Sequence, residues 1–143
     1  MKVDLKEIDL IHTHFLFSNG AVAYELKKEF GIDYVVAVRN TDVNYFFKYA
    51  IHLRNYGIKI LSNAKKIIFL SPAYKKYIID SYVPTKLKED IKSKSVVLPN
   101  GIDEFWLDNI NYNYKSYNKD ETIKLIYVGE LNKNKNVDSS IRA

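Results

Sequence analysis

The stretch Ser95-Val96-Val97-Leu98-Pro99-Asn100-Gly101-Ile102-Asp103 decides the fold, and the rest of the chain is interpreted outward from it. The apolar run Val96 to Leu98 predicts a short strand buried on both faces, as in a parallel sheet. Pro99 has no backbone N–H to donate, so strand pairing should end there. Asn100-Gly101 adopts positive φ at low cost, which predicts a sharp turn directly after the strand. Ligands of open α/β sheets bind at such strand ends, although a strand followed by a plain turn would look the same.

Composition indicates a folded protein without disulfides. The chain has 143 residues, of which 47% are apolar and 27% charged, and this suits a globular domain with its own core. The formal charge is +5, but the basic residues are spread along the chain. Such an excess favours anionic partners only weakly, and a soluble basic surface is the simpler interpretation. Cysteine is absent, which excludes disulfides and metal sites built on cysteine.

The N-terminus carries no secretory signal, since charged and apolar residues alternate from Met1 to Lys6. No apolar run approaches the roughly 20 residues that would span a bilayer. We therefore expect a cytoplasmic protein, with contact at the inner face of the membrane as a further expectation.

The first half of the chain has the pattern of a βαβ unit. Residues 9–15 predict a buried strand, and a helix should follow Ser18 and end at Gly31. The apolar run 34–38 predicts the next strand. A strand, a helix and a strand within about thirty residues indicate a right-handed parallel crossover.

The alternation continues up to the strand at Ser95. Residues 44–63 predict a helix that Gly57 breaks into two pieces. Residues 66–71 predict a strand, and Ser71 should cap a helix that begins with Pro72. A charged surface helix is expected over 86–92. The fold class is therefore α/β, with a Rossmann-like parallel sheet and flanking helices.

A second, incomplete unit is expected after the sheet. Residues 108–122 are polar and aperiodic, which indicates a linker. Residues 123–129 predict a new strand, 130–135 a loop and 136–143 the start of a helix. One strand and part of a helix cannot bury a core. We therefore interpret the chain as a fragment of a longer polypeptide, or as a truncated gene product.

Polar residues follow each predicted strand of the first domain. Because the carboxyl ends of parallel strands share one edge of the sheet, these residues should meet there and form a site. They are His12-Thr13-His14, Arg39-Asn40-Thr41-Asp42, Ser71-Pro72 and Asn100-Gly101-Ile102-Asp103.

Five segments in order resemble motifs of the retaining glycosyltransferases of family 4. The motifs are D-x-[IV]-H-x-H, the H-G-x-D loop, A-D-x-[IV]-[IV]-x-[VL]-S, V-x-P-N-G-[IV]-D and V-G-[RE]-L-x-x-x-K-[GN]. Their counterparts here are Asp9–His14, Arg39–Asp42, Asn63–Ser71, the opening stretch and Val128–Asn136.

This resemblance implies a partial two-domain GT-B fold. Residues 1–107 would be the later part of an acceptor-side Rossmann-like domain, 108–122 a linker and 123–143 the truncated start of the donor-binding domain. The family transfers a sugar from a nucleotide-sugar donor to a glycan or lipid-linked acceptor with retention of configuration, and without a cofactor or an essential metal. We expect the isolated chain to be inactive, because most of the donor pocket would be missing.

Arg39 and Asp42 are the candidate catalytic residues that the resemblance implies. Arg39 takes the place of the family's histidine, which lies near the transferred sugar. Arginine stays charged and cannot act as a base, but it could hold a phosphate or stabilise a developing charge. A structural ion pair between the two residues is the alternative. The candidate substrate-binding residues are His12, His14, Asn40, Ser71, Asn100 and Gly101.

The donor phosphates would be bound by Gly129, Lys135 and Asn136, again by resemblance. Lys135 follows Gly129 by six residues, as the family motif requires, and stands directly before the start of a predicted helix. Glu130 stands where arginine is usual, so one positive contact is missing. Lysines in a polar surface turn would give the same pattern.

The pair His12 and His14 leaves more than one interpretation. Both should point to the same face of a strand. Two imidazoles leave a zinc site short of ligands and His52 lies on a helix elsewhere, so no metal is expected. The pair could line a sugar pocket or simply form hydrogen bonds at the strand end.

Two other classes of function compete with sugar transfer. One is a non-catalytic α/β module whose strand edge binds a sugar or phosphate. The other is nucleic-acid binding, which the charge of +5 and the twelve tyrosines allow. The aromatic residues fall mostly at buried helical positions, so stacking platforms for bases, and nucleic-acid partners, are not expected.

Overall fold

The computed structural model describes residues 4–110, 122, 124, 126–131 and 133–142. The chain divides into two units, Met1–Ile102 and Asp103–Ala143, and each is described by itself.

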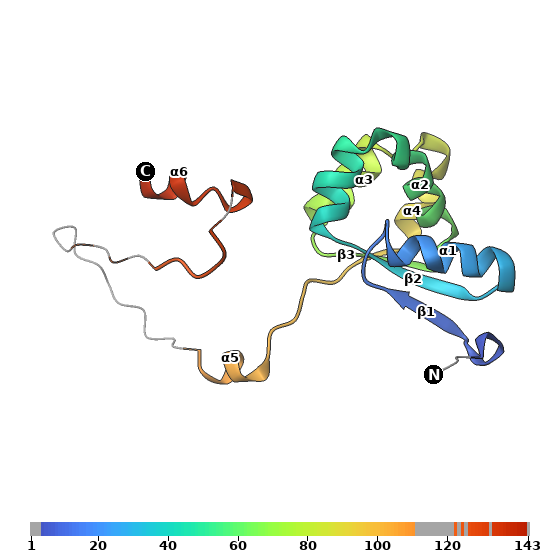
Figure 1. Ribbon diagram of the computed structural model, residues 1–143, viewed down its shortest axis with the longest axis horizontal. Coiled ribbons are helices and arrows are strands. Elements are labelled where there is room, and N and C mark those ends of the chain that lie inside the picture. Colours follow the sequence, from blue (N-terminus) through green and yellow to red (C-terminus); the bar gives the residue numbers. More distant parts are fainter. Residues whose placement is uncertain (1–3, 111–121, 123, 125, 132, 143) are drawn as a thin grey trace. The chain divides into compact units, whose positions relative to one another are not determined.

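The first unit is built on a four-stranded parallel sheet. Its strands are β1 (Leu10–Thr13), β2 (Asp33–Val38), β3 (Lys66–Phe69) and β4 (Ser95–Val97), and they lie side by side in the order of the sequence. Right-handed crossovers that always step in the same direction place all connecting helices on one face. Figure 1 shows these helices gathered on one side of the sheet. The predicted α/β class and Rossmann-like parallel sheet are confirmed.

Helices fill every connection between the strands. The short 3₁₀ turn η1 (Leu5–Glu7) precedes β1. Beyond β1 the helical elements are α1 (Asn19–Phe30), the π-helical η2 (Asp42–Phe47), the 3₁₀ turn η3 (Ile51–Leu53), α2 (Arg54–Asn63), α3 (Pro72–Ser81) and α4 (Thr85–Ser93).

Two predicted helix ends agree with the structure. Gly31 has φ 75° and its N–H donates to the carbonyl of Lys27, which closes α1. At α3, the Ser71 hydroxyl accepts from the Tyr74 N–H at 3.2 Å, and Pro72 occupies the first turn.

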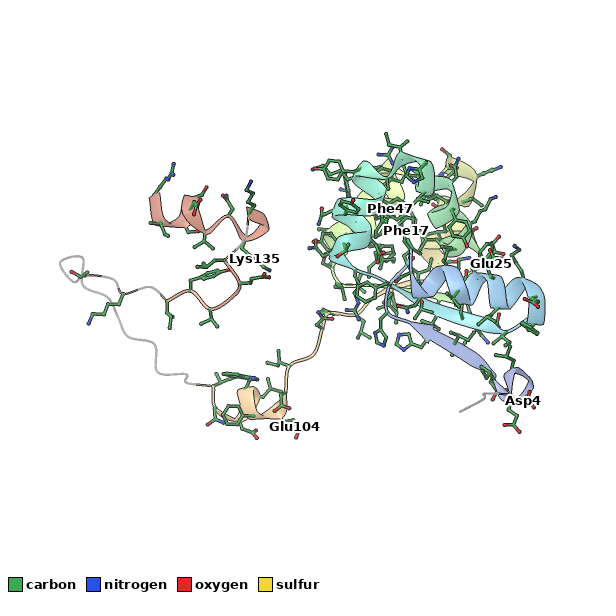
Figure 2. All side chains as sticks on the ribbon, in the orientation of Figure 1. Asp4, Phe17, Glu25, Phe47, Glu104 and Lys135 are labelled. Carbon is green, nitrogen blue, oxygen red and sulfur yellow. The ribbon has the colours of Figure 1, made fainter. Side chains whose placement is uncertain are left out.

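Gly57 does not break the helix predicted over 44–63. The interruption lies between η2 and α2, whereas Gly57 is buried inside α2. A Cβ at Gly57 would lie 2.6 Å from Cζ of Phe17 and 3.2 Å from Cζ of Phe47. The residue is therefore a close packing point for the two rings, which lie beside each other in Figure 2.

The expectations for the opening stretch were partly wrong. Among the described residues only β3 pairs with β4, so β4 is an edge strand; its Val96 is 44% exposed and the following Leu98 is 59% exposed. Pairing ends before Pro99 as predicted, with a last bond from the Leu98 N–H to the Phe69 carbonyl at 2.9 Å. Neither Asn100 nor Gly101 has a positive φ, so the predicted sharp turn is absent from residues 98–103. The Asn100 side chain bonds a distant arginine instead of shaping a local turn.

The core lies between the sheet and its helices. The strand register places Thr13, Val36, Ile67 and Ser95 on one row across the helix-facing side of the sheet, and all four are buried. The largest fully buried side chains around this row are Tyr34, Phe47, Phe69, Leu16, Ile60, Leu61, Ile78, Ile79 and Ile91.

The second unit departs from the prediction of a strand. Of residues 123–129, Ile123 and Leu125 lie outside the described residues. The described residues of this range form no strand, since no other described segment pairs with them. Most of the predicted linker, residues 111–121, is likewise outside the described part. The unit contains α5 (Glu104–Asp108), η4 (Lys133–Lys135) and α6 (Val137–Arg142). α5 was not predicted, and the Asp103 carboxylate caps it by accepting from the Phe105 N–H at 2.9 Å.

Within the described residues, no helix combines the length and the apolar character needed to cross a membrane.

Replacing Gly57 with alanine tests the packing role. We expect Gly57→Ala to lower the free energy of unfolding by about 1–2 kcal/mol, since overpacking outweighs the ~1 kcal/mol that alanine adds as a better helix former. The Phe17 ring cannot retreat freely, because it is stacked on Phe46 at 4.8 Å between centroids. Urea denaturation measures the change. Gly101→Ala, where nothing lies within 4 Å of a Cβ, is the control. A more stable Gly57→Ala protein would contradict the packing role.

Candidate functional site

Arg39 holds the carboxyl edge of the sheet together. It follows β2, and its guanidinium donates from Nε to the His14 carbonyl at 3.1 Å and from Nη1 to the Asn100 Oδ1 at 2.6 Å. Its Nη2 lies 3.3 Å from Nδ1 of His14. The predicted convergence of His14, Arg39 and Asn100 at this edge is thus observed directly. The structural alternative, an ion pair between the side chains of Arg39 and Asp42, is not how this guanidinium is used.

Asp42 is buried beneath this edge. The residue is 1% exposed, and its carboxylate accepts backbone N–H groups of Arg39 at 2.9 Å, Leu16 at 3.1 Å and Phe17 at 3.3 Å. Burial raises the pKa of the Asp42 carboxyl above its ordinary value, and the three N–H donors oppose that rise. The arrangement joins the loop after β1 to the loop after β2, which favours a positioning role over contact with a substrate.

His12 of β1 and His14, which directly follows the strand, lie together as predicted. The rings of His12 and His14 have centroids 4.8 Å apart, so both are on the same side of the strand. They border a shallow hollow of about 310 Å³ between β1 and α1, which Asn19 and Val22 also line. The described part of the chain holds no cluster of three or more His, Cys, Asp or Glu side chains suited to a metal ion.

A second group of polar side chains lies next to Arg39. The Oδ1 atom of Asn40 accepts a hydrogen bond from the Tyr74 hydroxyl at 2.7 Å and another from Nδ2 of Asn44. Asn44 Nδ2 also reaches the Tyr74 hydroxyl at 3.2 Å. Ser71 joins this group only indirectly, because its hydroxyl caps the helix that carries Tyr74.

The sequence did not single out Asn44 and Tyr74 as site residues. Both were interpreted only as parts of helices. Asn44 follows Asn40 by four residues, and Tyr74 is the third residue of the helix that Ser71 caps. These spacings are a usable signal only once the loop after β2 and the start of α3 are known to share an edge.

The predicted donor-phosphate residues are in the second unit. Asn136 follows η4 with φ 48°, and its Oδ1 accepts from the Ser139 hydroxyl at 2.9 Å. Lys133 and Asn136 border an open hollow of about 500 Å³ against α6. Gly129 and Lys135 lie on the same stretch before α6, and their role in binding phosphate stays a prediction.

The comparisons with known proteins agree with this geometry. The family model of Glycosyltransferase Family 4 matches residues 2–104, which contain the whole sheet and its polar edge. A curated protein of Methanocaldococcus jannaschii, described as an uncharacterized glycosyltransferase, is 29% identical over 150 residues; the match covers 99% of this chain and 35% of that protein. The chain thus spans about a third of the length of this relative. No solved structure gives a significant match. On its match to the family model and on its fold, the chain belongs to glycosyltransferase family 4.

Proposed function

We propose that the carboxyl edge of the sheet is the acceptor-side half of a sugar-transfer site. The reaction would move a sugar from a nucleotide-sugar donor to a glycan or lipid-linked acceptor, with retention of configuration. Membership of the family supports sugar transfer in general. The position of Arg39 supports the site, because ligands of open α/β sheets bind outside the carboxyl ends of the strands.

Arg39 is the observation on which the proposal depends. Its guanidinium is partly exposed and already oriented by the His14 carbonyl and by Asn100. Guanidinium groups bind phosphates through paired, charge-assisted hydrogen bonds, so an oriented one suits the phosphate of a donor or leaving group. A cation at this point would also stabilise the charge that develops as the sugar–phosphate bond breaks.

Asp42 would act through Arg39 and not on the substrate. Its buried carboxylate accepts a hydrogen bond from the Arg39 backbone N–H, and this bond fixes the backbone position from which the Arg39 side chain extends. The remaining edge residues, His12, His14, Asn40, Asn100 and Gly101, would line the sugar site, with Ser71 contributing through the cap of α3.

Gly129, Lys135 and Asn136 of the second unit would bind the phosphates of the donor. Two further parts of the proposal are a cytoplasmic location and contact with a membrane surface, which a lipid-linked acceptor would require. The chain spans 35% of its archaeal relative. We therefore propose that it binds ligands but does not complete the transfer alone.

Replacing Arg39 tests the proposed phosphate contact. Arg39→Gln is expected to weaken binding of inorganic pyrophosphate about 10- to 100-fold, since hydrogen bonds to a charged group contribute about 1.5–3 kcal/mol. Arg39→Lys keeps the charge without the planar, forked guanidinium, and its affinity for pyrophosphate should lie between those of the wild type and Arg39→Gln. Isothermal titration calorimetry measures the affinities. Lys28→Gln, which removes the same charge from an exposed pair with Glu25 on α1, is the control. Unchanged affinity in Arg39→Gln would refute the contact.

Replacing Asp42 tests its positioning role. Asp42→Asn should lower the free energy of unfolding by about 2–3 kcal/mol, because the amide keeps only one accepting oxygen and its NH₂ group then faces at least one backbone N–H that lacks an acceptor. Urea denaturation measures this loss, and Asp80→Asn on the exposed side of α3 is the matched control. Where the variant remains folded, pyrophosphate binding should weaken in parallel. Wild-type stability together with wild-type affinity would contradict the role.

The isolated chain is expected to show no turnover of UDP-glucose or GDP-mannose, measured as release of UDP or GDP over hours. Sustained release would overturn the proposal that it does not complete the transfer alone. If the chain binds nucleotide sugars or glycans without turnover, these affinities are then compared between the wild-type chain and the Lys135→Ala variant. Donor binding that requires Lys135 supports a transferase, whereas glycan binding that ignores Lys135→Ala supports a non-catalytic sugar-binding module.

A further inference from the structure

The group formed by Asn40, Asn44 and Tyr74, called the amide–phenol cluster below, joins the helical stretch that follows β2 to α3. Asn40 follows β2, Asn44 lies in the π-helical η2, and Tyr74 is in the first turn of α3. Their side chains form a closed ring of hydrogen bonds in which Asn40 Oδ1 accepts twice and the Tyr74 hydroxyl donates once and accepts once. Single-turn π segments inside helices occur frequently at functional sites.

The closed ring leaves two polar groups of exposed side chains unused. Asn40 retains its NH₂ group as a donor, and Asn44 retains its Oδ1 as an acceptor. No hydrogen bond from either group to another described residue is found, and both side chains are exposed. An adjacent donor and acceptor, both neutral, match a sugar hydroxyl, which donates one hydrogen bond and accepts others.

The amide–phenol cluster differs in chemistry from its neighbour. Arg39 offers a cation with donors only, which suits an anion, whereas the cluster offers no charge. The two are consecutive in sequence, at Arg39 and Asn40, and lie at the same edge of the sheet. A ligand with a phosphate next to a hydroxyl-rich ring would meet both at once.

We propose that the amide–phenol cluster is a specificity site for the hydroxyl groups of a neutral sugar, with Asn44 and Tyr74 as its previously unassigned members. The inference rests on the proposed function, because it assumes that sugars reach this edge. The ring of Tyr74 packs against the core, so its hydroxyl is held in place and orients both amides. Pre-orientation of this kind lowers the entropy cost of binding.

The test separates the cluster from Arg39. The 143-residue chain is titrated with the methyl glycosides of glucose, galactose, mannose and N-acetylglucosamine, and separately with UDP and UDP-glucose, while side-chain amide signals are followed by NMR. At least one glycoside should shift the amide signals of Asn40 and Asn44 saturably. Tyr74→Phe, which keeps the ring and removes the hydroxyl, should weaken this binding about 5- to 10-fold. Asn44→Ala should weaken it at least as much.

Matched variants exclude a purely structural effect. Tyr77→Phe removes a hydroxyl from the same helix, where it lies 3.0 Å from the hydroxyl of Tyr82, and should leave glycoside binding unchanged. Thermal unfolding of Tyr74→Phe and Asn44→Ala identifies any loss of fold. Rescue of stability with osmolyte should not restore glycoside affinity if the cluster contacts the sugar.

The outcomes also distinguish the source of the sugar. Weaker glycoside binding with unchanged UDP-glucose binding indicates an acceptor sugar, and weaker UDP-glucose binding with unchanged UDP binding indicates the donor sugar; either supports the cluster. Absence of saturable shifts with every sugar, or wild-type affinity in both Tyr74→Phe and Asn44→Ala, overturns it. Pyrophosphate binding that depends on Arg39 would leave the proposed function standing in that case. Pyrophosphate binding that does not depend on Arg39, with saturable glycoside binding retained, would refute the phosphate contact of Arg39 and leave the sugar contact at the cluster.

Discussion

The carboxylate of Asp42 is the contact on which the polar edge depends. It is almost fully buried, and it accepts the backbone N–H groups of Leu16, Phe17 and Arg39, which lie 26, 25 and 3 residues before it in the sequence. Removing a carboxylate from water is costly unless hydrogen bonds compensate, so these donors are needed for it to be there at all. In return the carboxylate fixes the path of the chain after β1 against the start of η2.

The orientation of the edge residues follows from this contact. With the backbone of Arg39 held by Asp42, the guanidinium reaches the His14 carbonyl on one side and Asn100 on the other. The side chain of the next residue, Asn40, accepts a hydrogen bond from the Tyr74 hydroxyl of α3. One buried acid therefore places a charged group and a neutral group beside each other, which are the two chemistries that a sugar phosphate presents.

The helical layer imposes a second constraint through Gly57 and Phe17. The Phe17 ring packs edge-on against Phe47 with centroids 5.2 Å apart, and it lies where a larger residue at position 57 would place its Cβ. Phe17 is also one of the residues whose backbone N–H binds Asp42. The packing of α2 and the geometry of the polar edge are therefore linked through a single aromatic residue.

The sequence alone determined the order of strands and helices in the first unit, its parallel sheet, the end of α1 at Gly31 and the cap of α3 at Ser71. These features are local, since they depend on apolar periodicity and on the preferences of single residues for caps and turns. From the same patterns it also followed that His14, Arg39 and Asn100 would share an edge.

Only the tertiary structure decided how those residues are used. Whether Gly57 breaks a helix or makes room for a ring depends on Phe17, 40 positions away in the printed sequence. Whether Asn100 shapes a turn or bonds Arg39 depends on a side chain 61 residues earlier. The burial of Asp42 and the joining of Asn44 to Tyr74 are likewise contacts between distant segments. Local patterns carry no information on such contacts, because the energy of a buried polar or packed group is set by its neighbours in space.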